Sequence, residues 1–223
     1  MCCYKEILII IPARAGSKRI KGKNRRLLNG VPLIEYSIKY AKKHIPGDII
    51  ISTDDKLIAP IANKLDVPIL WRKNNKAKDE TTATEVVQDV LNNLNKTYNY
   101  VILLQPTSPL RTKDLFKEAW KLFQNNSSKS LITVSPNKNK LGVVNNTVYF
   151  PKTYNFGERS QSLKPLYYEN GSLYLFSYTL AKEGKMVCDS PLALIINHPF
   201  GTVDIDTEID WLWAELIQKK YND

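Results

Sequence analysis

Cysteine is scarce in this sequence of 223 residues, and long apolar runs are missing. The three cysteines, Cys2, Cys3 and Cys188, are odd in number and form no C-x-x-C motif, which argues against a zinc or dithiol site. No apolar run reaches the roughly 20 residues that a membrane-spanning helix needs. The short apolar segment near the N-terminus leads into Pro12 without a small-residue cleavage site, so we expect no signal peptide. These absences predict a cytoplasmic protein with no membrane partner.

Acidic residues are absent from Ile7 to Ile34, a stretch that holds a dense group of cations instead. Seven lysines and arginines lie between Arg14 and Arg26, in the segment RAGSKRIKGKNRR, and the whole chain has a net charge of +10. Such an excess implies an anionic partner, which from charge alone is a nucleic acid, an anionic membrane surface or a phosphorylated small molecule. A basic surface exposed to water is the alternative.

Strand-like and helix-like patterns alternate along the chain as far as residue 135. Continuous β-branched runs predict buried strands, and apolar residues at helical spacing predict amphipathic helices between them. The expected strands are 7–12, 48–53, 67–71, 100–105, 130–135, 171–176 and 192–196, and the expected helices are 33–41, 57–65, 86–94 and 115–123. This alternation predicts an α/β fold of three layers, in which a mostly parallel, Rossmann-like sheet carries helices on both faces.

The alternation is interrupted over 136–170. This segment is rich in Asn, Lys, Ser and Tyr and holds only short apolar pieces, which indicates a small protruding arm that serves dimerisation or acts as a lid. A final helix is expected after Thr207, whose pairing with Asp210 is a variant of the capping box. No internal repeat is present, so we expect 1–223 to form a single domain.

Ligands of open parallel sheets bind beyond the carboxyl ends of the strands. In this sequence those ends carry the segments 13–23, 53–55 and 105–111, together with Arg72 and the loop around Asp204. We therefore expect the functional site to be built from these segments.

The loop after the first strand has features of a phosphate-binding turn. Gly16 lets backbone N–H groups approach an oxyanion, Arg14 offers a planar fork for two phosphate oxygens, and Lys18 offers a mobile charge. Neither a Walker A loop nor a G-x-G-x-x-G motif is present. Taken alone, the loop fits either a phosphate site or a solvent-exposed basic turn.

The segment IPARAGSKR at 11–19 resembles the signature of the acylneuraminate cytidylyltransferases, the CMP-sialic acid synthetase-like enzymes that activate nonulosonic acids. Further segments that resemble the family follow in order over nearly the whole chain: KN (23–24), NGVPLIEYSI (29–38), ISTDD (51–55), LLQPTSPLR (103–111), YENGSLY (168–174) and DIDTEID (204–210). The resemblance implies a nucleotidyltransferase of carbohydrate biosynthesis that condenses CTP with the 2-hydroxyl of a nine-carbon keto sugar acid. It also implies Mg²⁺ as the cofactor, release of pyrophosphate, and a homodimer that uses the arm.

For the nucleotide, the resemblance implies roles for the cations of the basic loop. Arg14, Lys18 and Lys21 would be catalytic, because they would neutralise the charge that builds up on the leaving pyrophosphate. A polyanionic nucleotide also explains a loop without carboxylates, since an acid there would compete for the same cations. The nucleotide-binding residues implied in this way are Arg14, Gly16, Ser17, Lys18, Asn24, Arg72 and Thr82 or Thr84.

The motif Asp204-Ile205-Asp206 puts two carboxylates on the same side of an extended segment, since side chains alternate along a strand. Paired oxygen ligands of this kind suit Mg²⁺. The place of the motif in the series implies that Asp204 and Asp206 hold the metal and that Asp206 is catalytic. Asp54 and Asp55 are a rival pair, although adjacent strand residues point to opposite sides and Asp54 also suits a helix cap.

The sugar acid is expected beside Gln105, whose amide follows a strand. A carboxylate substrate favours a guanidinium, and the candidates are Arg111 and Arg159. The resemblance adds Asn170 and Tyr174 to this pocket. The sequence around 159 is closer to enzymes for pseudaminic acid, whereas the other motifs look like those of sialic and legionaminic acid enzymes. The sequence therefore leaves N-acetylneuraminic, legionaminic and pseudaminic acid open.

Three other functions compete with this one. A cytidylyltransferase for an eight-carbon 3-deoxy keto acid would share the basic loop and differ on the sugar side. A nucleic-acid-binding protein would use the same cations on a phosphate backbone, but the loop is not interleaved with aromatic residues for base stacking, and the D-I-D motif would repel the backbone. A catalytically inactive relative would have no reason to keep the full set of cations and carboxylates. We therefore expect CTP and a sugar acid, and no nucleic acid, as partners.

Overall fold

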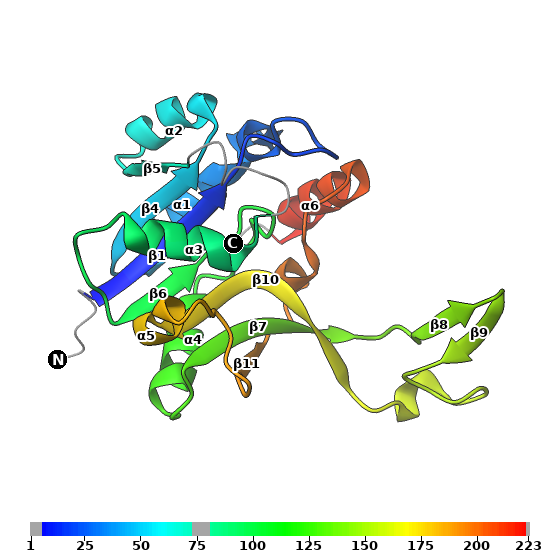
Figure 1. Cartoon of the computed structure of the whole chain (residues 1–223). Helices are drawn as coiled ribbons and strands as arrows, with labels where there is room; N and C mark the ends of the chain where they lie inside the picture. The colour runs from blue at the N-terminus through cyan, green and yellow to red at the C-terminus, as the bar shows by residue number, and fades with distance from the viewer. Residues whose placement is uncertain (1–5, 73–80, 222–223) are drawn as a thin grey trace.

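A computed structural model describes residues 6–72 and 81–221 (Figure 1). Its central sheet consists of β1 (Ile7–Ala13), β4 (Asp48–Thr53), β5 (Ile69–Trp71), β6 (Tyr100–Leu103), β7 (Ser130–Asn137), β10 (Leu166–Ser177) and β11 (Leu192–Ile195). The strands follow the order β11-β7-β10-β6-β1-β4-β5. All neighbouring pairs are parallel except those of β10, which runs antiparallel between β6 and β7.

The sheet lies between two layers of helices, because its central strand is apolar on both faces. Ile7, Ile9 and Ile11 of β1 face one core, and Leu8 and Ile10 face the other. The first core is closed by α1 (Leu33–His44), α2 (Ala59–Lys64) and α4 (Leu115–Gln124), and the second by α3 (Ala83–Asn92) and α5 (Tyr178–Lys182). The predicted three-layer α/β fold with a mostly parallel sheet is confirmed.

β10 differs from the predicted strand at 171–176 in length and direction. It begins at Leu166, so the last residues of the predicted arm belong to the sheet, where Tyr168 pairs with Ser135. A bulge between Glu169 and Tyr174 shifts its register against β7. An apolar run does not encode the direction of a strand, and the antiparallel course follows because the arm returns the chain beside β7.

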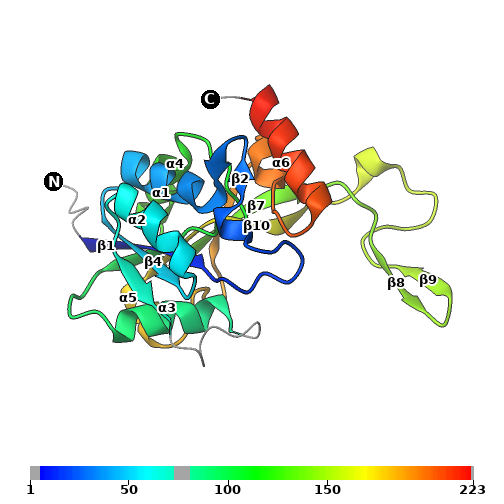
Figure 2. The same cartoon turned by 90° about the horizontal axis from the view of Figure 1, so that it is seen from above.

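The arm stands away from the sheet in both views (Figures 1 and 2). It contains a hairpin of β8 (Gly142–Asn145) and β9 (Val148–Pro151), followed by a short 3-10 helix, η5 (Ser160–Ser162). Asn146 and Thr147 connect the two strands with positive φ angles of 44° and 69°. Two such residues form the tight turn that matches the twist of a hairpin.

The last helix, α6 (Glu208–Lys220), covers the end of the sheet at which the chain leaves β1. The predicted capping box is present, since Thr207 accepts from the Asp210 N–H and the Asp210 carboxylate accepts from the Thr207 N–H. Trp211 packs into a third core with residues of the small hairpin β2 (Leu27–Leu28) and β3 (Val31–Pro32). The remaining 3-10 helices are η2 (Lys23–Arg25), η3 (Lys56–Ile58) and η6 (Pro199–Thr202).

None of the helices within 6–72 and 81–221 has the length and apolar character to cross a membrane. Cys188 is a free thiol, and Cys2 and Cys3 lie outside the described residues.

Candidate active site

The carboxyl ends of β1, β5 and β6 surround a pocket of about 450 Å³. The sequence predicted the functional site at this edge of the sheet, and the segments expected there do converge. The pocket is lined by Pro12, Arg14, Ser17, Lys18, Arg19, Lys23, Asn24, Arg72, Thr81, Ala83, Val86, Gln105, Pro106, Thr107 and Asp206.

The basic loop is fixed by contacts at both of its ends. Asn24 donates from Nδ2 to the carbonyl of Arg14 at 3.0 Å, and the Ala15 N–H donates to Asp54 Oδ1 at 2.8 Å. Gly16 has no heavy atom within 4 Å of the position a Cβ would take, so a ligand can approach its backbone closely. The Ser17 N–H, which was expected near phosphate, donates instead to the Ala15 carbonyl at 2.9 Å.

Asp54 and Asp55, the rival carboxylate pair, serve the local structure. Asp54 anchors the loop through the Ala15 N–H, and Asp55 accepts from the Leu57 N–H at 2.9 Å as the cap of η3. Asp55 also pairs with Arg25 at 3.5 Å. Neither carboxylate lines the pocket.

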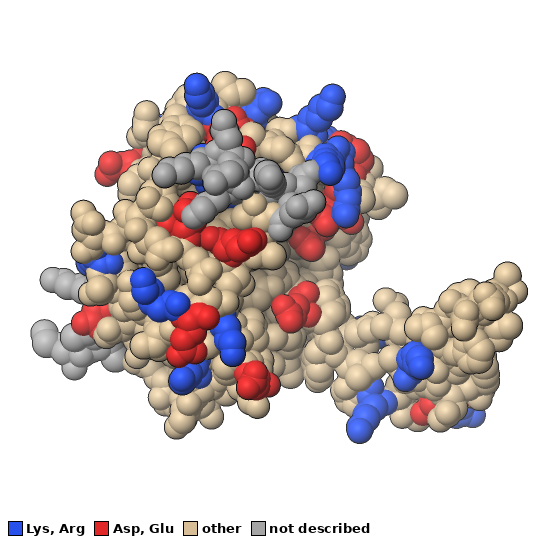
Figure 3. Space-filling model, viewed as in Figure 1, with Lys and Arg blue, Asp and Glu red and all other residues tan. Residues whose placement is uncertain are grey.

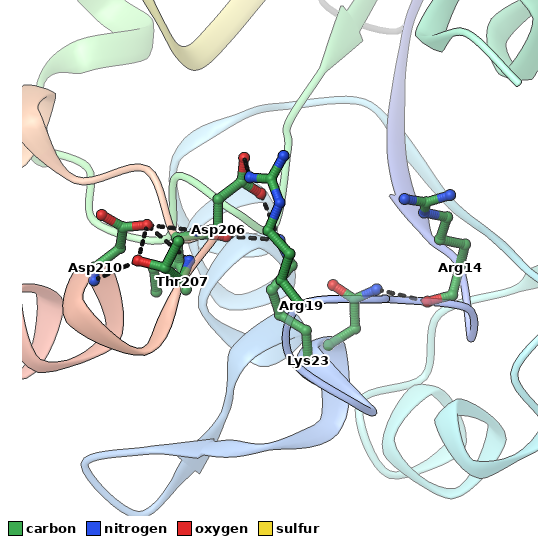
Figure 4. Close-up of polar contacts among 8 residues, drawn as sticks. Arg14, Arg19, Lys23, Asp206, Thr207 and Asp210 are labelled. Atoms are coloured by element: carbon green, nitrogen blue, oxygen red, sulfur yellow. Dashed lines mark hydrogen bonds and ion pairs between the residues drawn. The ribbon is translucent and has the colours of Figure 1, made fainter. Parts of the chain in front are cut away.

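Asp206 is the acid that meets the cations of the loop (Figure 4). Lys23 Nζ lies 3.0 Å from Asp206 Oδ1 and 2.6 Å from the Ile205 carbonyl, and Arg19 Nη1 lies 2.9 Å from Asp206 Oδ2. Lys21, the predicted catalytic lysine, is exposed and does not line the pocket. The η2 turn directs the side chain of Lys23 toward the pocket instead. Lys23 therefore lies beside Asp206, where Lys21 was expected to lie.

The two carboxylates of the D-I-D motif do lie on one side, because Ile205 between them is fully buried. Part of Asp204 is exposed, yet neighbouring protein atoms remove water from its carboxylate. This desolvation raises the pKa of Asp204, the Thr107 hydroxyl opposes the rise by donating to it, and the Asp206 charge adds to it. A divalent cation would relieve the repulsion between the two carboxylates.

The donor set therefore fits a cation such as Mg²⁺, which accepts few protein oxygens and completes its shell with water and phosphate. Within the described ranges, no group of three or more His, Cys, Asp or Glu side chains gathers as a closed metal cage. The remaining ligands would have to come from a bound substrate or water.

One wall of the pocket combines a buried guanidinium with apolar side chains. Arg72 donates from Nε to Ser52 Oγ at 2.9 Å and from Nη2 to the Ser52 carbonyl at 3.0 Å. Burial lowers the pKa of Arg72.

Thr82, a predicted nucleotide ligand, is the N-cap of α3 and its hydroxyl is engaged with Glu85 in a capping box. Thr81 lines the pocket in its place.

Gln105 lines the opposite wall, and its position depends on a glycine in β10. Gly171 has a positive φ of 69°, and a Cβ there would lie 2.6 Å from Gln105 Oε1. Tyr174 donates from its hydroxyl to Glu169 Oε2 at 3.2 Å. Desolvation raises the pKa of Tyr174, as do the nearby carboxylates of Glu169 and Asp204, so these three side chains lie close together.

Asn170 is buried and holds the bulge of β10 in place. Its Nδ2 donates to Ser135 Oγ at 2.9 Å, and its Oδ1 accepts from Thr133 Oγ1 at 2.6 Å and from the Ser172 N–H at 3.1 Å. Since these bonds occupy the amide, Asn170 supports the pocket rather than lining it.

Arg111 differs most from its expected position. The guanidinium is buried and donates to the Ser172 carbonyl at 2.7 Å, the Gln105 carbonyl at 2.9 Å and Ser37 Oγ at 3.0 Å. Burial without a carboxylate partner lowers the pKa of Arg111 to about 10. Arg111 therefore joins β6, β10 and α1, and it does not line the pocket that a substrate could enter.

Arg159, the second candidate for the substrate carboxylate, is exposed on the arm, immediately before η5. The arm stands away from the pocket, and Arg159 is not among the lining residues (Figure 1). In a single chain, Arg159 cannot reach the site.

A profile of the family described as "Cytidylyltransferase" matches residues 8–182. The chain belongs to the cytidylyltransferase family. It is 34% identical over 225 aligned residues, covering 96% of both chains, to CMP-N,N'-diacetyllegionaminic acid synthase of Legionella pneumophila. It is 32% identical over 222 residues, covering 95% of this chain and 96% of the relative, to pseudaminic acid cytidylyltransferase of Campylobacter jejuni. The predicted family resemblance is confirmed.

A solved structure with the same fold is CMP:2-keto-3-deoxy-manno-octonic acid synthetase complexed with CTP. The TM-score is 0.69 at 14% sequence identity, with 97% of this chain and 99% of the other covered. At this identity the similarity establishes the nucleotidyltransferase fold and nothing about the substrate.

Lys23 and Lys21 provide a matched test of this cytidylyltransferase site. We expect Lys23→Met to lower CTP-dependent pyrophosphate release by about 100-fold, because one preorganised cation beside Asp206 is lost. Lys21→Met should change the same rate by less than about threefold, since an exposed lysine outside the pocket contributes little. Equal losses in the two variants would contradict the assignment to Lys23.

The role of Arg111 can be tested by stability. Arg111→Met fills a similar volume but removes the buried guanidinium that donates to the Ser172 and Gln105 carbonyls, so we expect the free energy of unfolding to fall by about 3 kcal/mol in urea denaturation. The exposed Arg159→Met is the control and should change it by less than about 0.5 kcal/mol. An Arg111→Met variant of normal stability with a raised KM for the sugar acid would make Arg111 a substrate ligand.

Proposed function

We propose that this cytidylyltransferase condenses CTP with the 2-hydroxyl of a nonulosonic acid and releases pyrophosphate. The observation that carries the proposal is the convergence of a basic loop and Asp206 on one pocket, which also presents a buried arginine and apolar side chains to a base. The two relatives above are named for the transfer of CMP to legionaminic and pseudaminic acid, and they align with nearly the whole chain.

In the proposed reaction, the 2-hydroxyl oxygen forms a bond to the α-phosphorus of CTP. The bond between that phosphorus and the bridging oxygen to the β-phosphate breaks, pyrophosphate leaves with the bonding electrons, and the hydroxyl proton is lost to solvent. Arg14, Lys18 and Lys23 would balance the charge that develops on pyrophosphate. Asn24 would act by fixing the carbonyl of Arg14 and hence the course of the loop.

Asp204 and Asp206 are the residues that would hold Mg²⁺. When bound, the ion supplies positive charge to phosphate oxygens and orients them for displacement. The chain's own contribution is to keep the two carboxylates on one side of their segment, with Asp206 at the pocket, through buried Ile205 and the capping box at Thr207. Lys23 and Arg19 neutralise Asp206 until the ion is bound.

For the sugar acid, we propose the wall that Gln105 forms at the pocket together with Glu169 and Tyr174, which lie beyond its lining residues. The amide and the phenol donate or accept hydrogen bonds, and Glu169 accepts them, which suits the hydroxyl and acylamino groups of a nonulosonic acid. Gly171 and Asn170 keep the side chains of this wall in position, and in this proposal they do not contact the sugar themselves.

We further propose that the protein is a homodimer of the cytoplasm, where CTP is available. The arm exposes many apolar side chains, among them Val144, Val148 and Phe150, which a second subunit would cover. Arg159 would then act on the sugar carboxylate in the pocket of the second subunit.

The proposal is tested by mass spectrometry of products after incubation with CTP and Mg²⁺ and a panel of acids. The panel contains N-acetylneuraminic, legionaminic and pseudaminic acid and an eight-carbon 3-deoxy keto acid. We expect a CMP-sugar and an equal amount of pyrophosphate from at least one nine-carbon acid, since the two relatives reported above are named for such acids. Product from the eight-carbon acid alone would overturn the proposal.

Metal binding is tested by Asp206→Asn, which removes one carboxylate charge with almost no change in volume. We expect kcat to fall by at least about 100-fold and Mn²⁺ binding, followed by electron paramagnetic resonance, to weaken at least tenfold, because the loss of a metal ligand or of its partner typically costs 10–100-fold. The control is Asp189→Asn, in an exposed carboxylate outside the pocket. Unchanged Mn²⁺ binding by the Asp206 variant would remove this residue from the metal site.

A further inference from the structure

The turn after β6 brings three consecutive residues, Gln105, Pro106 and Thr107, to the wall of the pocket. The Ser108 N–H closes this turn by donating to the Gln105 carbonyl at 3.2 Å. Ser108 is fully buried, and its Oγ donates to the Asn170 carbonyl of β10 at 3.0 Å. Pro106 restrains the turn further, because proline fixes its φ angle at about −65°. Thr107 therefore projects from a turn that the protein interior holds in place.

Thr107 contacts the D-I-D motif twice, once through its backbone and once through its side chain. Its carbonyl accepts from the Ile205 N–H at 2.8 Å, and its hydroxyl donates to the Asp204 carboxylate. Ile205 is fully buried, so the backbone contact fixes the depth at which the motif lies in the fold. The hydroxyl then sets the direction in which the Asp204 carboxylate points. Threonine suits this task, because its β-branched side chain has few χ1 rotamers.

The two carboxylates of the motif have partners of different charge. Asp206 pairs with Lys23 and Arg19 at 3.0 and 2.9 Å, whereas Asp204 accepts a hydrogen bond from a neutral hydroxyl. A hydroxyl orients a carboxylate without cancelling its charge, and a single donor leaves most of the roughly four acceptor sites of a carboxylate open. Thr107 therefore orients Asp204 and keeps its charge available to a cation.

The contacts on the outer side of the same segment are weaker anchors. At the upper right of Figure 3, cations lie beside acids where the loop after β1 meets α6. Arg19 pairs with Asp206 and Arg26 with Glu208, and the side chains of these pairs are 39–66% exposed. Exposed ion pairs contribute little to the position of a segment, because water and salt screen them. The contact between the Thr107 carbonyl and the buried Ile205 backbone is the firmer hold on the motif.

We infer that Thr107 is a positioning residue for the metal site, because it orients Asp204 and joins the D-I-D motif to the turn that carries Gln105. The inference rests on the proposed function and deepens it, since Asp204 and Asp206 are the residues proposed to hold the ion. Gln105 belongs to the wall proposed for the sugar acid. One turn therefore fixes the metal ligands and this wall relative to each other, and the reaction depends on that relation, since the sugar hydroxyl must meet the α-phosphorus at a fixed distance.

The inference is tested by comparing Thr107→Val with Thr107→Ser. Valine has nearly the same volume and keeps the backbone carbonyl but lacks the hydroxyl, whereas serine keeps the hydroxyl. We expect Thr107→Val to weaken Mn²⁺ binding, followed by electron paramagnetic resonance, by at least about tenfold, because loss of the partner of a metal ligand typically costs 10–100-fold. Thr107→Ser should bind Mn²⁺ within about threefold of the parent chain, since the donor is retained.

Kinetics distinguish positioning from direct contact with a substrate. With an acid that the parent chain converts, we expect Thr107→Val to lower kcat at saturating Mg²⁺ by at least about tenfold, because misplaced reacting groups slow the chemical step. The KM values for CTP and for the acid should stay within about threefold of those of the parent chain, since no substrate contact is lost. A raised KM for the acid with unchanged Mn²⁺ binding would make Thr107 a substrate ligand and overturn the inference.

The control is Thr112→Val, which changes a partly buried threonine of the same segment that does not line the pocket. Its Mn²⁺ binding and kcat should match those of the parent chain. The thermal midpoint of each variant shows whether the fold is intact. If Thr107→Val is unstable, Thr107→Ala removes the same hydroxyl, and the same loss of Mn²⁺ binding is expected from it.

The inference is overturned if Thr107→Val binds Mn²⁺ as the parent chain does, or if Thr107→Ser loses as much affinity as Thr107→Val. The substrate panel separates this failure from that of the proposed function. A parent chain that makes a CMP-sugar, with normal Mn²⁺ binding by Thr107→Val, would refute the positioning role alone. A parent chain that makes no CMP-sugar, with Mn²⁺ binding lost in Thr107→Val and kept in Thr107→Ser, would refute the function alone.

Discussion

The separation of cations and carboxylates along the chain is the constraint on which this structure depends. The basic loop has no acid of its own, and the charge that balances Lys23 comes from Asp206 and the Ile205 carbonyl, more than 180 positions later. The fold must therefore bring the last segment of the chain to the end of its first strand. The third core does this, because Trp211 and Ile205 pack with Ile20 and Leu28 beside the loop. A pocket lined by Arg14, Lys18, Arg19 and Lys23 together with Asp206 is the result.

A second layer of buried polar residues keeps this pocket rigid. Arg111 connects the Gln105 and Ser172 carbonyls to Ser37, and Asn170 connects β10 to β7. Both were expected to contact the sugar. A motif combines residues that contact a ligand with residues that hold those in place, and a sequence does not separate the two groups. The burial and the hydrogen bonds of each residue in the folded chain separate the residues that contact a ligand from those that support them.

Much of the fold could be predicted from the sequence. The strand at 48–53 and the helices at 33–41 and 115–123 have clear periodicity and lie close to where they were expected. The antiparallel direction of β10 and the short helix α5 were missed, because an apolar run has no direction and five residues give too short a pattern. In the site, Arg14, Lys18, Asn24, Arg72, Gln105 and Asp206 do line one pocket. Lys23 lines the pocket instead of Lys21, and Thr81 instead of Thr82, since a shift of one or two positions along a turn decides which side chain points inward.

The sequence by itself determined the family, the layered sheet and the chemical character of the site, because apolar periodicity and ordered motifs survive without coordinates. Only the tertiary structure decided which residue of each motif reaches the pocket, and that Asp206 rather than Asp54 pairs with Lys23 and Arg19. Only it revealed that Thr107 contacts both Asp204 and Ile205. The physical reason is the same in each case. Contact and burial depend on where distant segments meet, and local patterns specify each segment without specifying its neighbours.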